Sequence, residues 1–257
     1  MSHPLIDCTR QPELSPGAAW RTVRRRCSQG FGVGRDPLPA ALVGLTMVTG
    51  MLDAISYLGL GRVFIAMMTG NVVFLGLAFG KTVEASVPGP AVAIVSFALG
   101  IVLAARTAKL ATQRARQHWF FHAMAVECAL LAGATAVAAL APPAAATTRY
   151  LVIALLALAM GARCSTVRRL NVADFPITVG LTGALIAFVH DCPLSGGERA
   201  RAARRLGVVL AMGVGATVGG FLMTAVGLRW SLLAVLCVVA AITLAVRLHP
   251  AGPTGGN

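Results

Sequence analysis

Charged residues are scarce in this sequence. Only 12% of its 257 residues are Asp, Glu, Lys or Arg, and nine of these are acidic. A soluble domain carries about 25% charged residues. Hydrophobic residues make up 57% of the chain, and no long polar linker divides it beyond residue 36. The composition excludes a soluble domain and predicts an all-α protein, a polytopic transmembrane helix bundle whose partner is the lipid bilayer.

Because acidic residues are few, the net charge is +13. A nucleic-acid-binding protein gathers Lys and Arg on one folded face. In this chain the basic residues stand between apolar runs, where they set the orientation of membrane helices. Nucleic acid is therefore not an expected partner.

The sequence also lacks the motifs of metal and catalytic sites. Its six cysteines are scattered without a Cys-x-x-Cys pair, so we expect neither a disulfide framework nor a zinc site. It has no His-Glu-x-x-His motif, no Gly-x-Ser-x-Gly elbow and no phosphate-binding loop. We expect no metal, no cofactor and no enzymatic activity. A membrane-embedded enzyme is a weaker alternative, and it requires the carboxyls of Asp53 and Glu127 to share one cavity.

The apolar residues fall into eight segments. Before them, residues 1–36 form a polar stretch with six arginines and no apolar signal sequence, which predicts a disordered basic cytoplasmic tail. The predicted transmembrane domain covers residues 37–248, and residues 249–257 are predicted to be a second disordered tail. The segments are about 38–60, 63–80, 87–105, 119–141, 146–167, 175–190, 206–228 and 230–247.

Segments 63–80 and 175–190 are short for a membrane crossing, which takes about 20 residues. Loops rich in Lys and Arg stay in the cytoplasm, so charge can decide between spanning and re-entry. If both short segments re-enter, six spans place 18 basic residues inside and four outside; if both span, the counts are 13 and nine. The charge pattern predicts six spans with both termini in the cytoplasm.

Six spans leave three in each half of the chain, so the halves, about 38–141 and 146–247, would have opposite orientations. Such inverted repeats are common among transporters. Ala- and Gly-rich chains also produce short matches by chance, so the repeat is a hypothesis. The matches are Val48-Thr49-Gly50 with Ala159-Met160-Gly161 at an offset of 111, Thr69-Gly70 with Thr182-Gly183 at 113, and Gly100 with Gly215 at 115.

Two acidic residues stand inside apolar segments. By the helical rise, Asp53 lies roughly 22 Å into the first span and Glu127 about 12 Å into the fourth. Intramembrane acids usually face the bundle interior and mark function. For Asp53 the alternative is that the helix ends early. Glu127 has no basic residue in its own span, so it must pair across helices or hold a proton.

Arg163 occupies nearly the place in the second half that Asp53 occupies in the first. An ion pair between the two is one possibility, but an inverted repeat puts them on opposite sides of the membrane midplane. We therefore expect Arg163 to extend to the cytoplasmic headgroups, beside Arg168 and Arg169.

The Thr-Gly steps in the short segments suggest broken helices. Gly lets a membrane helix unwind, Thr hydroxyls can satisfy the freed backbone groups, and half-helix ends near the midplane bind ions or polar groups. The same small residues also suit close helix packing. The predicted substrate-binding residues are Asp53, Thr69, Gly70, Asn71 and Glu127 in the first half and Arg163, Thr178, Thr182 and Gly183 in the second.

The stretch Gly50-Met51-Leu52-Asp53-Ala54-Ile55-Ser56-Tyr57-Leu58, then Val63-Phe64 and Met68-Thr69-Gly70-Asn71, resembles the YoaK family of bacterial integral membrane proteins. The resemblance covers about residues 40–245 and implies a membrane protein with a domain of unknown function. Two departures remove amides from the predicted polar centre. Met67 stands where the family usually has Asn, and Arg163-Cys164 stand where Gln-Asn is usual.

These observations favour a small-solute or ion transporter of the bacterial cytoplasmic membrane, with a polar centre between two inverted repeats. The alternative is a non-transporting membrane scaffold or sensor module, which would associate through its small-residue faces, for example as a homo-oligomer.

Overall fold

The computed structural model describes residues 38–80, 87–110, 116–141, 145–170, 181–191 and 199–248. The two predicted tails and Thr178 lie outside these ranges. All regular secondary structure in the described ranges is helical. The long helices are α2 (Leu38–Gly59), α4 (Pro88–Leu110), α5 (Arg116–Leu140), α6 (Ala146–Leu170), α8 (Arg199–Val226) and α9 (Leu228–Leu248), and the short ones are α3 (Met68–Phe79) and α7 (Leu181–Asp191).

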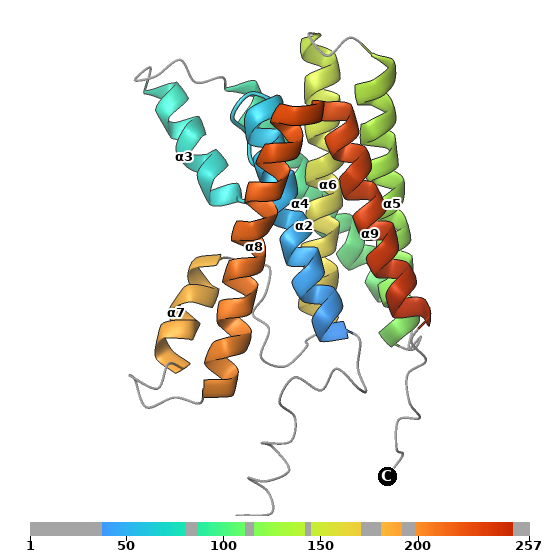
Figure 1. Ribbon diagram of the computed structural model, residues 1–257. Coiled ribbons are helices and arrows are strands. Elements are labelled where there is room, and N and C mark those ends of the chain that lie inside the picture. Colours follow the sequence, from blue (N-terminus) through green and yellow to red (C-terminus); the bar gives the residue numbers. More distant parts are fainter. Residues whose placement is uncertain are drawn as a thin grey trace, which may run out of the picture. The chain divides into compact units, whose positions relative to one another are not determined.

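The six long helices contain apolar stretches of 20 to 24 residues, which is enough to cross a membrane. They run alternately up and down the bundle (Figure 1). The 12 residues of α3 extend only about 18 Å at 1.5 Å per residue, so α3 is too short to cross. The prediction of six spans and short intervening helices is confirmed for the described residues.

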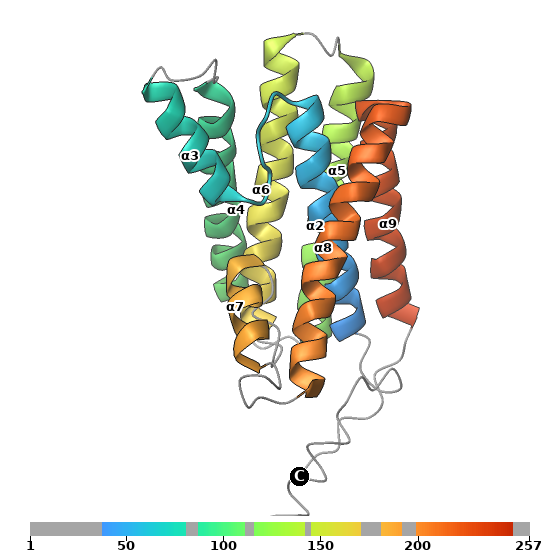
Figure 2. The ribbon, with the colours of Figure 1, turned by 60° about the vertical axis from the view of Figure 1, so that its left-hand side comes forward.

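A tight turn after α2 sends the chain back into the bundle. Gly61 and Arg62 both have left-handed backbone conformations, with φ of 90° and 60°, and Arg62 N donates to Tyr57 O over 3.0 Å. Residues 63–67 then run down beside α2, and α3 rises again to the same end (Figure 2). The short helix α7 lies at the opposite end of the bundle (Figures 1 and 2).

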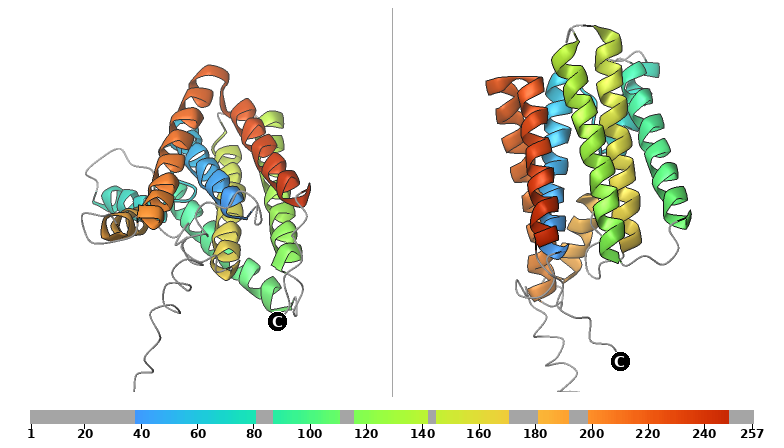
Figure 3. Two further views of the ribbon diagram at one scale, coloured as in Figure 1. Left: turned by 60° about the horizontal axis from the view of Figure 1, so that its bottom comes forward. Right: turned by 90° about the vertical axis from the view of Figure 1, so that its right-hand side faces the viewer.

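The helices form two lobes. Lobe A consists of α2, α7, α8 and α9, and lobe B of α3, α4, α5 and α6, because helix contacts within each group are extensive. Helices α5 and α9 pack against each other across the lobes, as Figure 3 shows from the side. The lobes do not follow the chain order, since α2 leaves the first half to pack with α8 and α9, while α6 packs with α4 and α5.

Two close crossings, α2 with α8 and α4 with α6, organise the lobes. At five glycines an added Cβ atom would overlap a backbone carbonyl of the facing helix, so only glycine permits this approach. Small residues allow such close packing in membranes. The contacts are Gly50 on Met212, Gly215 on Met47 and Gly219 on Met51 between α2 and α8, and Gly100 on Leu158 and Gly161 on Phe97 between α4 and α6.

Helices α2 and α6 are the most enclosed. Of the residues in their spanning stretches, 61% and 56% are buried, against 17–33% in the other four long helices. The outer helices expose large apolar side chains such as Phe221 and Trp230, as contact with lipid requires. The buried polar side chains of α2 and α6, such as Asp53 and Arg163, are therefore in the most shielded part of the bundle.

Basic residues collect at one end of the bundle. Ten of the 14 described Lys and Arg residues lie at the end where α2 begins, three lie at the other end, and Arg163 is inside. This asymmetry is the signature by which membrane proteins mark their cytoplasmic side. The three at the far end are Arg62, Arg149 and Arg229.

Candidate functional site

A line of polar groups follows one face of α2. Leu45, Thr49 and Asp53 stand four residues apart, so they share a helix face at intervals of about 6 Å. Each of the three takes part in hydrogen bonds to other segments of the chain. They divide into two neighbouring clusters, one that anchors the turn before α3 and one built on an ion pair.

The loop-anchoring cluster begins with Asp53, whose side chain is 4% exposed. Its Oδ1 accepts hydrogen bonds from the backbone N–H groups of Ile65 and Ala66, both at 2.8 Å. These amides precede the first turn of α3, and no side chain of α3 caps that turn at Met67. Asp53 therefore accepts hydrogen bonds at the N-terminal end of α3, where a carboxyl group stabilises the helix.

Asn71 secures the same turn from the other side. Its Oδ1 accepts from Phe64 N at 2.9 Å, and its Nδ2 donates to Phe64 O at 2.6 Å. Both backbone groups of Phe64 are thus paired by one fully buried amide. In a membrane interior, an extended segment needs such partners because water cannot supply them.

Aromatic packing completes the cluster. The ring of Phe64 stacks on Tyr57 and Phe74, with centroids 5.4 and 5.8 Å apart. Gly70 faces this ring, and a Cβ atom there would come within 2.7 Å of it. Gly70 is therefore required to seat Phe64, which explains the glycine of the Thr-Gly step by packing.

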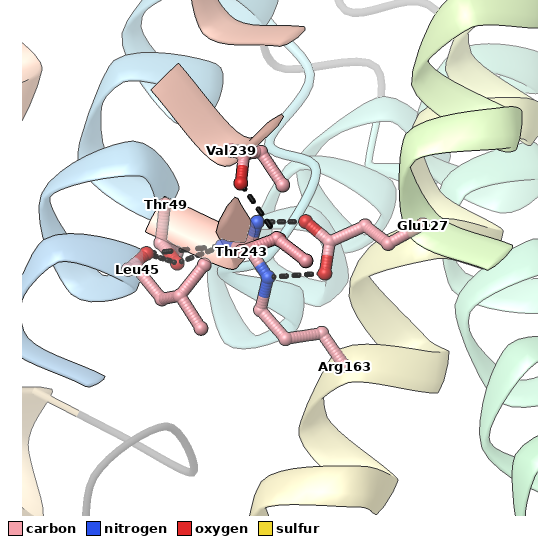
Figure 4. A network of polar contacts seen from close by, with 6 residues as sticks. All are labelled: Leu45, Thr49, Glu127, Arg163, Val239 and Thr243. Atoms are coloured by element: carbon pink, nitrogen blue, oxygen red, sulfur yellow. Dashed lines mark hydrogen bonds and ion pairs between the residues drawn. The ribbon is translucent and has the colours of Figure 1, made fainter. Parts of the chain in front are cut away.

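The ion-pair cluster joins three helices around Arg163, which is 2% exposed. Its Nε donates to Glu127 Oε2 at 2.9 Å, and its Nη2 donates to Glu127 Oε1. Its Nη1 donates to Leu45 O at 3.0 Å and to Thr49 Oγ1 at 3.1 Å. Figure 4 shows the guanidinium between α2, α5 and α6, with Thr243 of α9 close by and bonded to Val239 O.

This arrangement corrects the prediction for Arg163. It does not extend to the headgroups, and its carboxyl partner is Glu127 rather than Asp53. A bidentate carboxylate neutralises the guanidinium inside the bundle, and the Leu45 carbonyl and Thr49 hydroxyl take two further bonds. Glu127 pairs across helices, as one of its two predicted alternatives required.

The predicted residues of the short helices have different surroundings. Asn71 is buried, and Gly70 packs under Phe64. Thr69, Thr182 and Gly183 are exposed, so in this structure they are not part of a buried polar centre. The backbone groups that Thr hydroxyls were expected to satisfy are paired by Asp53 and Asn71 in the turn before α3.

Sequence reasoning missed Thr49, the Leu45 carbonyl and Phe64. Thr49 could have been found, because it stands four residues before Asp53 on the same helix face. The carbonyl of Leu45 carries no signal in the sequence. Phe64 was noted only as part of a motif, and its role depends on backbone groups that any residue possesses.

The two clusters share a location in the fold. Asp53 and Thr49 belong to lobe A, the turn that Asp53 anchors leads into α3 of lobe B, and the Glu127–Arg163 pair belongs to lobe B. Every polar contact of α2 just described therefore links the lobes. The arrangement can hold the lobes together and place charge and hydrogen-bonding groups between them.

Comparison with known proteins places the chain in a family. Residues 41–246 match the family described as "Protein of unknown function (DUF1275)". The chain belongs to this family. Its DUF1275 region includes all eight described helices apart from a few terminal residues, so both polar clusters lie within it.

The chain is also similar to the UPF0700 transmembrane protein YoaK of Bacillus subtilis (strain 168). It is 33% identical over 147 residues, which cover 57% of this chain and 64% of the relative. The chain thus matches less than two thirds of that protein's length. No solved structure matches the chain.

Proposed function

We propose that this DUF1275 protein is a carrier for a small polar solute or an ion in the bacterial cytoplasmic membrane. It would be built from two inverted repeats, α2–α5 and α6–α9, with both termini in the cytoplasm. The excess of basic residues at the end where α2 begins supports that orientation.

The observation that carries the proposal is that four of the five glycine contacts in the two crossings correspond in pairs. Gly219 is the exception, because Ala104 stands at the equivalent position. Gly50 and Gly161 are 111 residues apart, and Gly100 and Gly215 are 115 apart. The backbone groups that these glycines contact obey the same offsets: Met47 and Leu158 differ by 111, and Phe97 and Met212 by 115. Contacts that map onto each other in this way favour two copies of one fold over chance similarity.

Most of the remaining helix contacts follow the same relation; the exception is the small α8–α9 contact, which has no comparable contact between α4 and α5 among the described residues. If α2, α3, α4 and α5 correspond to α6, α7, α8 and α9, then lobe A corresponds to lobe B, and the α5–α9 contact corresponds to itself. Carriers with inverted repeats alternate their access by moving one bundle against another around a central site. The polar contacts of α2 stand at the boundary where such a movement would occur.

Topology is the first part of the test. On a background without the six native cysteines, single cysteines would replace Gly80, at the end of α3, and Thr107, near the end of α4. Both positions are exposed. We expect a membrane-impermeant thiol reagent to label Gly80→Cys from outside the cell and Thr107→Cys only after permeabilisation. Labelling of both from one side would contradict the crossing by α4 and the inverted repeat.

Transport is the second part. The purified chain in liposomes would be supplied in turn with amino acids, sugars, organic acids and inorganic ions, with protein-free liposomes as control. Saturable flux of one solute class is expected. If no class moves although the topology is as proposed, the carrier function is refuted. The scaffold alternative then gains support if the chain isolates from native lipid as a tight oligomer.

A further inference from the structure

The carboxyl group of Asp53 uses its two oxygens very differently. Oδ1 receives two backbone N–H groups, whereas Oδ2 is buried and has no hydrogen-bond partner. A carboxylate shares its charge over both oxygens and can accept hydrogen bonds at each. A neutral carboxyl has one carbonyl oxygen that accepts and one hydroxyl oxygen. The bonding of Asp53 favours the neutral form, with the carbonyl at Oδ1, because burying an unpartnered hydroxyl at Oδ2 costs less than burying an unpartnered share of a negative charge.

Counter-charge is also missing at Asp53. Among the described residues no cation lies within ion-pair distance of it, and the buried Arg163 is bound in two places by Glu127. The neighbouring stretches 206–226 of α8 and 230–246 of α9 contain no Asp, Glu, Lys, Arg or His. Away from the helix ends, the titratable and charged groups on the elements around Asp53 are Tyr57 and Arg62 after it in the chain, His122, Glu127 and Cys128 on α5, Arg163 and Cys164 on α6, and Cys237 on α9. The other basic residues of α5, α6 and α9 stand in the first or last turns of these helices.

We propose that Asp53 is a proton-binding site, with the proton on Oδ2. An ionised carboxyl without a counter-ion inside a membrane helix costs about 2.5–3.5 kcal/mol at the helix centre even on insertion scales. Binding a proton forms one O–H bond and removes the charge, while both hydrogen bonds at Oδ1 remain.

The fold also supports the ionised form of Asp53. When the proton leaves, the negative charge stands beside the N-terminal end of α3, where helix amides and the helix dipole favour an anion. Both forms of Asp53 therefore have support in the fold. Since the Ile65 and Ala66 amides bind a carboxylate more strongly than a carboxyl, proton loss tightens the contact between α2 and the turn into α3.

In the proposed carrier, the proton bound by Asp53 is the ion whose movement is coupled to that of the solute. This assignment rests on the proposed carrier function. Asp53 lies in lobe A, and the turn that it holds leads into α3 of lobe B. Loading and release of a proton would thus change the strength of a contact between the lobes. Glu127 has no such role, because it forms the ion pair with Arg163.

Infrared spectroscopy of the full chain in lipid nanodiscs tests the proton site directly. At neutral pH we expect the carbonyl stretch of a protonated carboxylic acid, shifted when aspartate is labelled with carbon-13. The band should vanish in Asp53→Asn, which keeps an acceptor for Ile65 and Ala66, and persist in the double variant Glu127→Gln/Arg163→Gln. A wild-type spectrum without the aspartate band refutes the proposal, even if the variants fail to fold.

Two further measurements separate the alternatives. If sodium ions raise the thermal stability of the wild type but not of Asp53→Asn, and no protonated band exists, the site binds a metal cation and the proton assignment is wrong. In liposomes, a pH gradient should drive solute flux in the wild type and not in Asp53→Asn. A band without any flux leaves the proton site standing and refutes the carrier, whereas flux that ignores the gradient refutes the coupling alone.

Discussion

Replacing one partner of the Glu127–Arg163 pair should destabilise the protein far more than replacing both. Glu127→Gln leaves the guanidinium of Arg163 in the bundle with one neutral amide in place of a carboxylate. Arg163→Gln leaves the carboxylate of Glu127 without its two charged donors. Because both side chains are about 1% exposed, water cannot compensate for either loss.

The magnitude follows from the burial of the pair. Breaking a buried ion pair by removing one partner costs about 3–5 kcal/mol, because an uncompensated charge remains. In the double variant Glu127→Gln/Arg163→Gln no charge remains, and two amides can bond to each other and to Thr49. We expect it to lose about 1–2 kcal/mol, on the scale of one or two neutral hydrogen bonds. Additive single effects would instead give about 6–10 kcal/mol.

A double-mutant cycle measures the difference. The free energy of unfolding would be determined in lipid nanodiscs for the wild type, both single variants and the double variant. Arg168→Gln is the matched control, because this arginine lies on the same helix and is exposed; it should change stability by less than about 0.5 kcal/mol. Additivity of the two single effects would show that the pair does not act as a unit and would refute the reasoning.

Two further predictions concern packing and the turn before α3. Gly161→Ala forces a methyl group into a backbone carbonyl of α4 and should cost about 1–3 kcal/mol of the free energy of unfolding. The control Gly213→Ala, with nothing within 4 Å of the added Cβ atom, should be neutral or slightly stabilising in the same unfolding assay. Equal losses of stability in the two variants would contradict the crossing geometry. Asn71→Leu unpairs both backbone groups of Phe64, so hydrogen–deuterium exchange of residues 63–67 should increase. The control Thr69→Val, at an exposed position of the same helix, should leave the exchange of these residues unchanged. If residues 63–67 of Asn71→Leu stay protected from exchange, other groups hold the turn.

The spans could be predicted from the sequence because membrane crossing depends on local properties. Apolar length and the placement of basic residues gave six spans and two short helices, and the charge of Asp53 and Glu127 was enough to single them out inside the bundle. The partner of Arg163 could not be predicted in this way. It depends on α5 and α6 packing together while α2 approaches from the other lobe, and only the three-dimensional arrangement contains that information.

The short helices show the same limit. A Thr-Gly step marks a place where a helix can break, but not which groups satisfy the broken backbone. In the first half, Asp53 reaches forward 12 residues to Ile65 and Asn71 reaches back seven residues to Phe64. Such contacts follow from the chain reversing at Gly61 and Arg62, and a non-glycine residue with positive φ is not foreseeable from composition.

The exchange of α2 and α6 between lobes has a consequence for how the protein is made. The chain enters the membrane from its N-terminal end, so α2 is inserted long before α8 and α9, which cover much of its surface, have been synthesised. Until then the glycine surface around Gly50 and the carboxyl of Asp53 lack part of their final enclosure. The short turn of residues 60–67 is the first segment able to shield Asp53, and it emerges directly after α2. Anchoring this turn thus protects an unpaired acid during the interval in which the rest of lobe A does not yet exist.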